Sequence, residues 1–487
     1  MNKNDISSNL SETLSELQKR LCRTAELNIT SAHICGQRIA VASIEGMVST
    51  QQLTEAVLRP LSELERTGIS EGSSLFGYIT GSIFLTADRQ LVYSLDTASQ
   101  LLFSGFAVIF SDGECRACAL GLQGYEMRSV STPEAEPTVK CSQDSFTETV
   151  RVNMSLVRRR LKTPKLVMDI KQVGKLSKTD VCIMYIKDRA PADIVEKTEK
   201  RLSEIELDVM LTSGYAEPFI DDSFGESLFS SCVYTERPDL VCTRLMQGRV
   251  CIIVDGTPFA LILPSLFAEC FFTMDDYSSK PFYSTFIRWI RYISFFLAVG
   301  FPGLYVALAD HHPEVFSMKL LLNLSAAEEA TPYPLMAEVI MLMIFFEIMR
   351  EAGLRLPKAV GSAVSIVGGL FIGDAAVKSG IVSAPLLIVV GITATASFVN
   401  PQLEQPSAVL RLLFILAGGF AGLFGIAVCL AAVTVNICAM DDYAVSYTAP
   451  AAPLYPSSLR DILFMKSFKE YEKTRTTLSS IREGEHD

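Results

Sequence analysis

Histidine, a common catalytic acid–base and metal ligand, is scarce in this chain, and so is tryptophan. Its 487 residues include four histidines and one tryptophan. The sequence contains no P-loop, no Ser-His-Asp pattern and no metal-ligand cluster. We therefore expect neither an enzyme nor a bound cofactor or metal ion.

The 12 cysteines form no recognisable framework. Cys115 and Cys118 make a single CxxC pair, whereas a structural zinc site needs a second pair of ligands. We interpret these cysteines as reduced thiols of a cytosolic domain. His311 and His312 follow an apolar run directly, and we interpret them as loop residues rather than ligands.

A basic stripe and an export signal are also missing. The formal net charge is −11, and the charges are spread along the chain, which is not the pattern of a nucleic-acid-binding protein. The N-terminus is polar and lacks the apolar core of a signal peptide. Lys280, Arg288 and Arg291 flank the first long apolar segment, so the positive-inside rule predicts a cytoplasmic N-terminal domain.

Long apolar segments are abundant, and they gather between residues 286 and 438. About 20 apolar helical residues cross a bilayer core of roughly 30 Å. The sequence therefore predicts a multi-pass helical membrane domain in contact with lipid. Its five apolar segments are 286–309, 335–352, 359–377, 382–399 and 409–436.

The number of spans stays open between four and five. Five spans would put the tail opposite the N-terminal domain, although the tail carries several lysines and arginines that favour the inside. One segment is then re-entrant or interfacial, which leaves four spans. Segment 335–352 is the least certain, because it contains Glu338 and Glu347, each costing about 2.5–3.5 kcal/mol at the centre of a helix.

The region before the membrane domain mixes strand and helix patterns, so the predicted fold class is a soluble α/β region of two subdomains followed by membrane helices. Asp-Gly turns at residues 112–113 and 255–256 each separate two apolar runs and predict β-hairpins. The triple arginine 158–160 could bind phosphate or an acidic partner, but we favour a solvated helix face with one arginine in a salt bridge. The predicted parts are a polar helix at 1–25, subdomains at 26–130 and 145–280 joined by a linker at 131–144, the membrane domain at 286–438, and a charged tail at 439–487.

The segment 359–378 has two distinct faces. Small residues recur every four positions and allow close helix contact in lipid; they are Gly361, Ser365, Gly369 and Gly373. The opposite face is apolar with one acid, and it contains Val360, Val364, Val367, Phe371 and Asp374. Either Asp374 pairs with Lys378 at the helix end, or this face lines a pore with the valines and Phe371 as a dewetting gate.

Two further clusters have alternative interpretations. Gly418 and Gly422 in the last apolar segment predict tight helix packing. Glu347, Arg350 and Glu351 form either local salt bridges at a helix end or a gating network.

Several motifs between residues 145 and 465 resemble the A subunits of spore germination receptors, the GerA family. The matching motifs are FTETVRVNMSLVRRRLKTPKL, TERPDLV, GRVCIIVDGTPFALILP, IRWIRY, PYPLMAEV, FFEIMREAGLRLP and VSIVGGLFIGDAAVKSGIVSAP. Their order and spacing agree with the family as well. One departure is Asp374, where the family usually has a polar amide.

The resemblance implies a receptor subunit in the inner membrane of an endospore. It implies a transporter-like B subunit and a lipoprotein C subunit as partners, and a homo-oligomeric ring that encloses a nutrient-gated ion channel. Two alternatives remain: a channel similar to the stage V sporulation protein AF, which acts in germination without sensing nutrients directly, and a secondary transporter. A transporter would predict inverted repeats, and the five apolar segments contain no convincing repeat.

Overall fold

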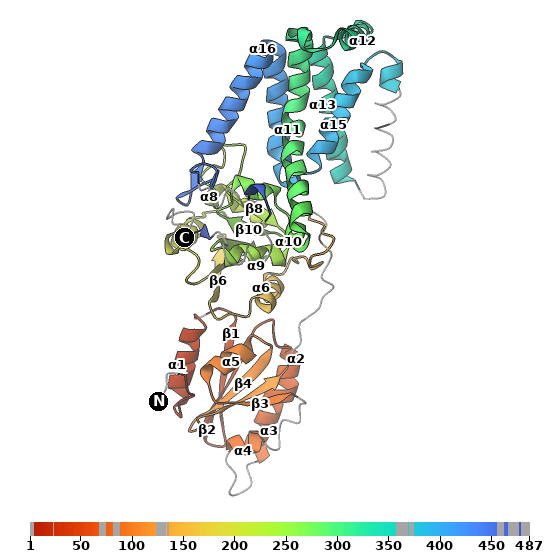
Figure 1. The fold of residues 1–487 in the computed structure, drawn as a ribbon. Coiled ribbons are helices and arrows are strands. Elements are labelled where there is room, and N and C mark those ends of the chain that lie inside the picture. Colours follow the sequence, from red (N-terminus) through yellow and green to blue (C-terminus); the bar gives the residue numbers. More distant parts are fainter. Residues whose placement is uncertain are drawn as a thin grey trace. The chain divides into compact units, whose positions relative to one another are not determined.

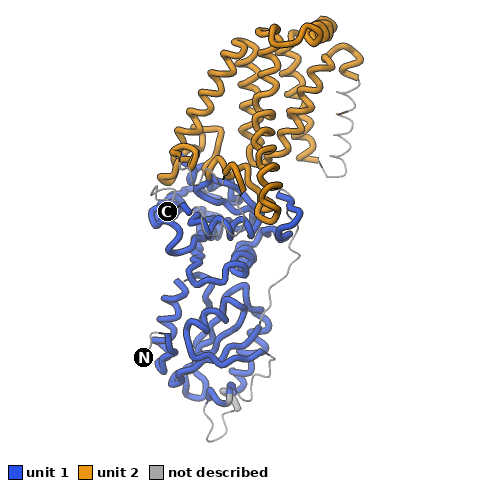
Figure 2. Tube along the Cα trace, in the orientation of Figure 1, with its two compact units in different colours: residues 1–222, 232–265, 473–487 blue, residues 223–231, 266–472 orange. Residues whose placement is uncertain are grey.

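The computed structural model describes residues 4–22, 24–67, 75–80, 88–122, 133, 136–356, 369, 375–454, 462–465 and 477–478. The chain divides into two compact units, coloured separately in Figure 2. Unit 1 comprises residues 1–222, 232–265 and 473–487, and unit 2 comprises residues 223–231 and 266–472. Unit 1 is α/β and unit 2 is mostly helical, as the sequence predicts.

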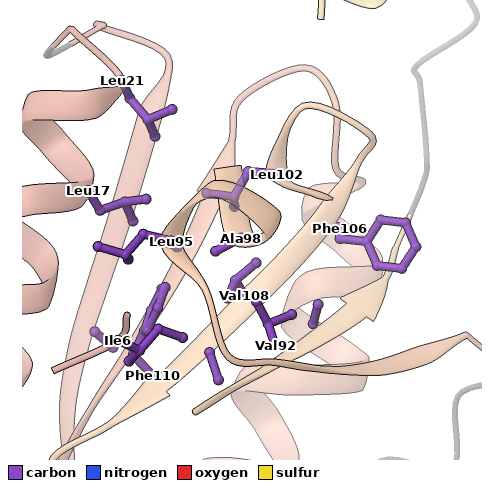
Figure 3. Close-up of a cluster of buried hydrophobic side chains, with 14 of the residues drawn as sticks. Ile6, Leu17, Leu21, Val92, Leu95, Ala98, Leu102, Phe106, Val108 and Phe110 are labelled. Atoms are coloured by element: carbon purple, nitrogen blue, oxygen red, sulfur yellow. The ribbon is translucent and has the colours of Figure 1, made fainter. Parts of the chain in front are cut away.

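Unit 1 begins with a three-layer module around an antiparallel sheet of strand order β1-β2-β4-β5-β3 (Figure 1). Strand residues alternate between two cores: Ala40 and Ala42 face α1 and α5, whereas Ile39 and Val41 face α3. Figure 3 shows the first of these cores. The elements are α1 (Leu10–Arg20), β1 (Leu27–Ile34), β2 (Gln37–Ile44), α2 (Thr50–Leu53), the π-helical η1 (Thr54–Leu58), α3 (Arg59–Thr67), α4 (Leu75–Tyr78), β3 (Arg89–Val92), α5 (Leu95–Leu102), β4 (Phe106–Ser111) and β5 (Ala117–Gly121).

The second module of unit 1 repeats the topology of the first. Its sheet has the order β6-β7-β9-β10-β8, and one helix again precedes the sheet, while further helices lie between the second, third and fourth strands. Its elements are α6 (Val150–Arg160), β6 (Leu166–Val173), β7 (Thr179–Ile186), α7 (Ala192–Ser203), α8 (Glu217–Ile220), β8 (Val233–Thr235), α9 (Pro238–Met246), β9 (Val250–Val254) and β10 (Ala260–Leu263).

The two Asp-Gly turns hold the same position in each module. In the first, the Leu10 N–H donates to Asp112 Oδ1 at 3.0 Å, and in the second, the Val150 N–H donates to Asp255 Oδ1 at 2.8 Å. Each aspartate thus accepts from the first residue of the leading helix, where free N–H groups favour negative charge. The following glycines, Gly113 and Gly256, both have positive φ, of 84° and 90°.

The predicted hairpins are confirmed, with β4 paired to β5 and β9 to β10 in antiparallel register. The predicted polar helix at 1–25 is α1, and it is an integral part of the first module because Leu10 and Leu17 are buried there. The prediction that the triple arginine is solvated is wrong for Arg158. Arg158 is completely buried rather than solvated, whereas Arg159 and Arg160 pair with Asp144.

Unit 2 is dominated by helices, and two of them among the described residues are long and apolar enough to cross a membrane, Pro281–His311 and Pro401–Ala439. The single proline inside α11, Pro302, does not end the helix. The elements are α10 (Met274–Ser278), α11 (Pro281–His311), α12 (Met318–Glu329), α13 (Leu335–Arg355), α15 (Ala384–Ser397), α16 (Glu404–Ala439) and a short ribbon of β11 (Asp441–Asp442) and β12 (Val445–Ser446).

The helix α16 reverses direction at Gly422, which has φ 59° and ψ −143°. A Cβ on Gly418 would lie 3.2 Å from Cδ1 of Ile426, a proximity that eight residues of straight helix, about 12 Å long, exclude. Leu403 and Ile437, from opposite ends of the helix, share one hydrophobic cluster. Figure 1 accordingly draws α16 as two limbs. The sequence prediction of one continuous segment at 409–436 is therefore wrong.

The first limb of α16 lies directly against α11. A Cβ added to Gly303 would overlap the carbonyl oxygen of Phe414, and one added to Gly418 would overlap the carbonyl oxygen of Gly303. Backbones approach this closely only where side chains are absent. Gly303, which directly follows Pro302, thus lies at the contact between the two helices.

Candidate functional site in the helical unit

A network of four charged side chains connects α13 to the first limb of α16. Arg411 Nη1 lies 2.9 Å from Glu347 Oε1, and Arg350 Nη2 lies 2.8 Å from Glu347 Oε2. Arg350 Nη1 also reaches Glu404 Oε1 at 3.2 Å. Glu347 therefore bridges two arginines, and the four formal charges cancel.

Arg411 is the most deeply buried member of this network, with 1% of its surface exposed. Its Nε donates to the Ala298 carbonyl oxygen of α11 at 2.7 Å, and its guanidinium lies 5.8 Å from the ring centroid of Phe346. The side chain thus connects three helices. Its Nη2 has no acceptor within the described part of the chain.

The geometry bears on the two interpretations of Glu347, Arg350 and Glu351. Glu351 makes a local, exposed pair with Arg355 at 2.6 Å and no ion pair with another helix within the described residues. Glu347 and Arg350 do pair with each other within one helix, but they also reach Arg411 and Glu404 of α16. The network is therefore tertiary, and it couples the position of α13 to that of α16.

Sequence reasoning missed Arg411 and Glu404. The available signal was Arg411 itself, a lone arginine inside an apolar segment, since an ionisable residue there usually pairs within the protein. The identity of its partner was not predictable, because Glu347 lies 64 positions earlier.

A cavity of about 570 Å³ adjoins the network. Most of its lining is apolar, and charged side chains are confined to Arg411 with Glu347 and to Glu351 with Arg355. The apolar lining residues are Met343, Ile344, Ile348, Ala352, Ala408, Leu412 and Ile415.

The predicted pore face cannot be compared with the structure. Val360, Val364, Val367, Phe371 and Asp374 all lie outside the described residues. Of the predicted small-residue face, Gly361, Ser365 and Gly373 also lie outside them, and Gly369 is an exposed helical residue. Of the predicted packing glycines, Gly418 lies against α11 and Gly422 at the reversal of α16.

The surroundings of the CxxC pair and of His311 do not favour metal binding. Cys118 is buried on β5 while Cys115 is exposed, and burial raises the pKa of the Cys118 thiol to about 11, which suppresses the thiolate that metal binding needs. Among the described residues no three histidine, cysteine or acidic side chains are grouped closely enough to hold a metal ion. His311 is the last residue of α11, and its Nε2 lies 2.8 Å from the Gly419 carbonyl oxygen near the reversal of α16.

Comparison with known proteins identifies the family. The sequence model of one protein family, the Bacillus/Clostridium GerA spore germination proteins, matches residues 12–477, which include nearly all of both units. The chain belongs to the GerA family. The resemblance carried by the sequence motifs is thereby confirmed.

Three curated relatives are similar along most of their length. Spore germination protein KA of Bacillus subtilis (strain 168) is 34% identical, and the alignment covers 98% of this chain and 89% of that protein. The membrane protein YfkQ of the same organism is 36% identical, with coverage of 88% and 82%. Spore germination protein GerLA of Bacillus cereus is 31% identical, with 99% of each chain covered.

One solved structure aligns with part of the chain. It is the crystal structure of the N-terminal domain of the A subunit of the Bacillus megaterium spore germinant receptor GerK3. The alignment has 29% identity and a TM-score of 0.44, and it covers 54% of this chain and 97% of that one.

Proposed function

We propose that this GerA protein is the A-type subunit of a spore germinant receptor. What supports the proposal most is the family match over residues 12–477, together with relatives named as spore germination proteins that cover nearly the whole chain. In this role the chain works with a transporter-like B subunit and a lipoprotein C subunit. Its membrane is the inner membrane of the spore.

The chain crosses that membrane several times, and its tail returns to the side on which α11 begins. Leu403 and Ile437 share a hydrophobic cluster with Phe271 and Phe295, which lie just before α11 and in its first half. The reversal at Gly422 adds one crossing to the five apolar segments. The total is then six, and an even number brings the tail, with its lysines and arginines, to the cytoplasmic side that the positive-inside rule favours.

The oligomer of this subunit forms an ion channel, whose pore face is Val360, Val364, Val367 and Phe371. Asp374 lies beside the pore and influences ion selectivity through its charge. The segment 359–378 follows α13 directly in the chain, so the network of Glu347, Arg350, Glu404 and Arg411 couples this segment to α16. Nutrient binding to the assembled receptor shifts this coupled arrangement from closed to open.

The test measures germinant-triggered ion release from spores that carry Val364→Ala or Asp374→Asn. Removing two methyl groups from a dewetting gate lowers the barrier to water and ions, so Val364→Ala raises release without germinant. Asp374→Asn changes the ratio of cations released. Val428→Ala on the exposed face of α16 is the control and behaves as the parent. Release and selectivity that stay at parental values in both variants would sink the pore assignment.

A further inference from the structure

We propose that the cavity between α13 and α16 binds one acyl chain of a phospholipid, whose phosphate contacts Arg355 at the mouth. The proposal rests on the membrane position given above, and it assigns a lipid site that the receptor role does not require. The cavity volume of about 570 Å³ lies in the range of about 300–1,000 Å³ that is typical of small-molecule sites.

The lining of the cavity matches a hydrocarbon chain. Ile344, Ile348 and Leu412 line the cavity, and their side chains are exposed in the isolated chain by 51%, 58% and 42%. Apolar surface of this kind is stable where hydrocarbon covers it. The bilayer supplies that hydrocarbon at high local concentration, which favours a lipid over a soluble ligand.

The mouth of the cavity matches a phosphate. Arg355, in the last turn of α13, uses Nε and Nη2 on Glu351 Oε1, while Nη1 has no partner within the described residues. Both side chains are more than half exposed, so water screens their ion pair and a phosphate can compete with Glu351 for the guanidinium. An arginine guanidinium binds phosphate through parallel hydrogen bonds, and this one is placed where the apolar lining ends.

The inner end of the cavity offers no unbalanced positive charge to a ligand. Arg411 is already balanced there by Glu347 at 2.9 Å, and Arg350 by Glu404 at 3.2 Å. An anionic group placed inside would be desolvated without a free countercharge, which is strongly unfavourable. The phosphate therefore belongs at Arg355 and the acyl chain inside, with its methyl end toward Ile415.

The first experiment maps where the lipid lies. The full chain is reconstituted in vesicles that contain phosphatidylglycerol with a diazirine on its acyl chain, and the adducts formed on illumination are located by peptide mass spectrometry. Adducts are expected on the peptides of Ile344, Ile348 and Leu412. Leu412→Trp fills the cavity and lowers these adducts at least about fivefold, a loss near 1 kcal/mol of binding.

The matched control is Leu413→Trp, on the neighbouring residue of the same helix. Leu413 is 44% exposed, against 42% for Leu412, but it does not line the cavity. Leu413→Trp is therefore expected to leave the adducts on Ile344 and Ile348 unchanged. Equal loss in both variants, or adducts spread evenly over all lipid-facing helices, would each overturn the proposal.

The second experiment tests the phosphate contact. In detergent, the same probe is titrated against the parent, Arg355→Gln and Arg355→Lys. A lost charged hydrogen bond raises the half-saturating concentration about tenfold in Arg355→Gln, and Arg355→Lys recovers part of that loss. Unchanged saturation in Arg355→Gln overturns the assignment of the phosphate. Alkaline extraction of the vesicles keeps the outcomes separate: a chain that is released was never inserted, which refutes the membrane proposal, whereas a retained chain without adducts refutes only the lipid site.

Discussion

At the scale of single residues, a buried ion pair joins the two modules of unit 1. Arg158 of α6 donates through Nε to Glu26 Oε2 at 2.9 Å, and neither side chain is more than 2% exposed. Two further donors of the guanidinium go to the carbonyl oxygens of Thr163 and Leu166. A buried charge with this many partners holds the modules in one register, because any displacement leaves the charge unpaired.

Glu26→Gln is expected to open this junction. It leaves the Arg158 charge buried without its countercharge, which costs about 3–5 kcal/mol. Cys182 is a suitable reporter, since it is fully buried and its pKa is raised by burial and then by the negative charge of Glu26. Its labelling by a thiol reagent at constant pH is expected to be at least about 100-fold faster in the variant.

The same helix offers the control. Arg151 of α6 pairs with Glu45 of the first module at 2.8 Å, but both side chains are 40% exposed. Glu45→Gln is therefore expected to cost at most about 1 kcal/mol, less than a tenfold change in labelling. If the two variants label Cys182 at the same rate, the buried pair does not hold the junction. The sequence could not reveal this pair, because the partners are 132 positions apart and arginine triplets are usually solvated.

At the scale of elements, local patterns predicted what local interactions determine. The Asp-Gly turns with apolar runs on both sides predicted β4–β5 and β9–β10, since turn chemistry and alternation act within about ten residues. The reversal of α16 was missed because apolar residues continue through Gly422 without a polar break. A glycine with positive φ looks in the sequence like any packing glycine. The backbone angles of Gly422 and the proximity of Gly418 to Ile426, which the structure shows, distinguish the two.

The contact of α11 with the first limb of α16 depends on two glycines. Gly303→Ala would drive a methyl group into the Phe414 carbonyl, and Gly418→Ala would drive one into the Gly303 carbonyl. Each is expected to destabilise unit 2 by about 1–3 kcal/mol through overpacking. Trp289 is the single tryptophan of the chain and lies on α11, so its fluorescence reports the thermal unfolding of the detergent-solubilised protein.

Gly300→Ala is the matched control, because it lies one turn away on α11 and a Cβ there meets nothing within 4 Å. In a helix this change is expected to be neutral or stabilising by up to about 1 kcal/mol. A midpoint that falls as far in Gly300→Ala as in Gly303→Ala would mean that helix contact is not the cause.

At the scale of the whole molecule, unit 1 contains two modules with the same strand order. In unit 2, the end of α16 packs in one hydrophobic cluster with Phe271, which precedes α11. The duplication was invisible in the sequence because it lies in strand order and in the two equivalent aspartates, Asp112 and Asp255, rather than in repeated residues. The pore segment remains a prediction, since its residues lie outside the described structure. The family, in contrast, was predictable, because it is carried by continuous motifs such as FFEIMREAG, whose residues are neighbours in the sequence.

The packing of the end of α16 near the start of α11 predicts the membrane topology. Because α16 reverses at Gly422 and Ile437 rejoins the cluster of Phe271 and Phe295, the tail is expected on the same side as the segment that enters α11, with α12 on the other. Epitope tags at both termini and after Glu329 test this in protoplasts. Only the tag after Glu329 is expected to bind antibody before permeabilisation, and all three afterwards. A C-terminal tag that is accessible from outside would contradict the reversal as a membrane hairpin and return the chain to an odd number of spans.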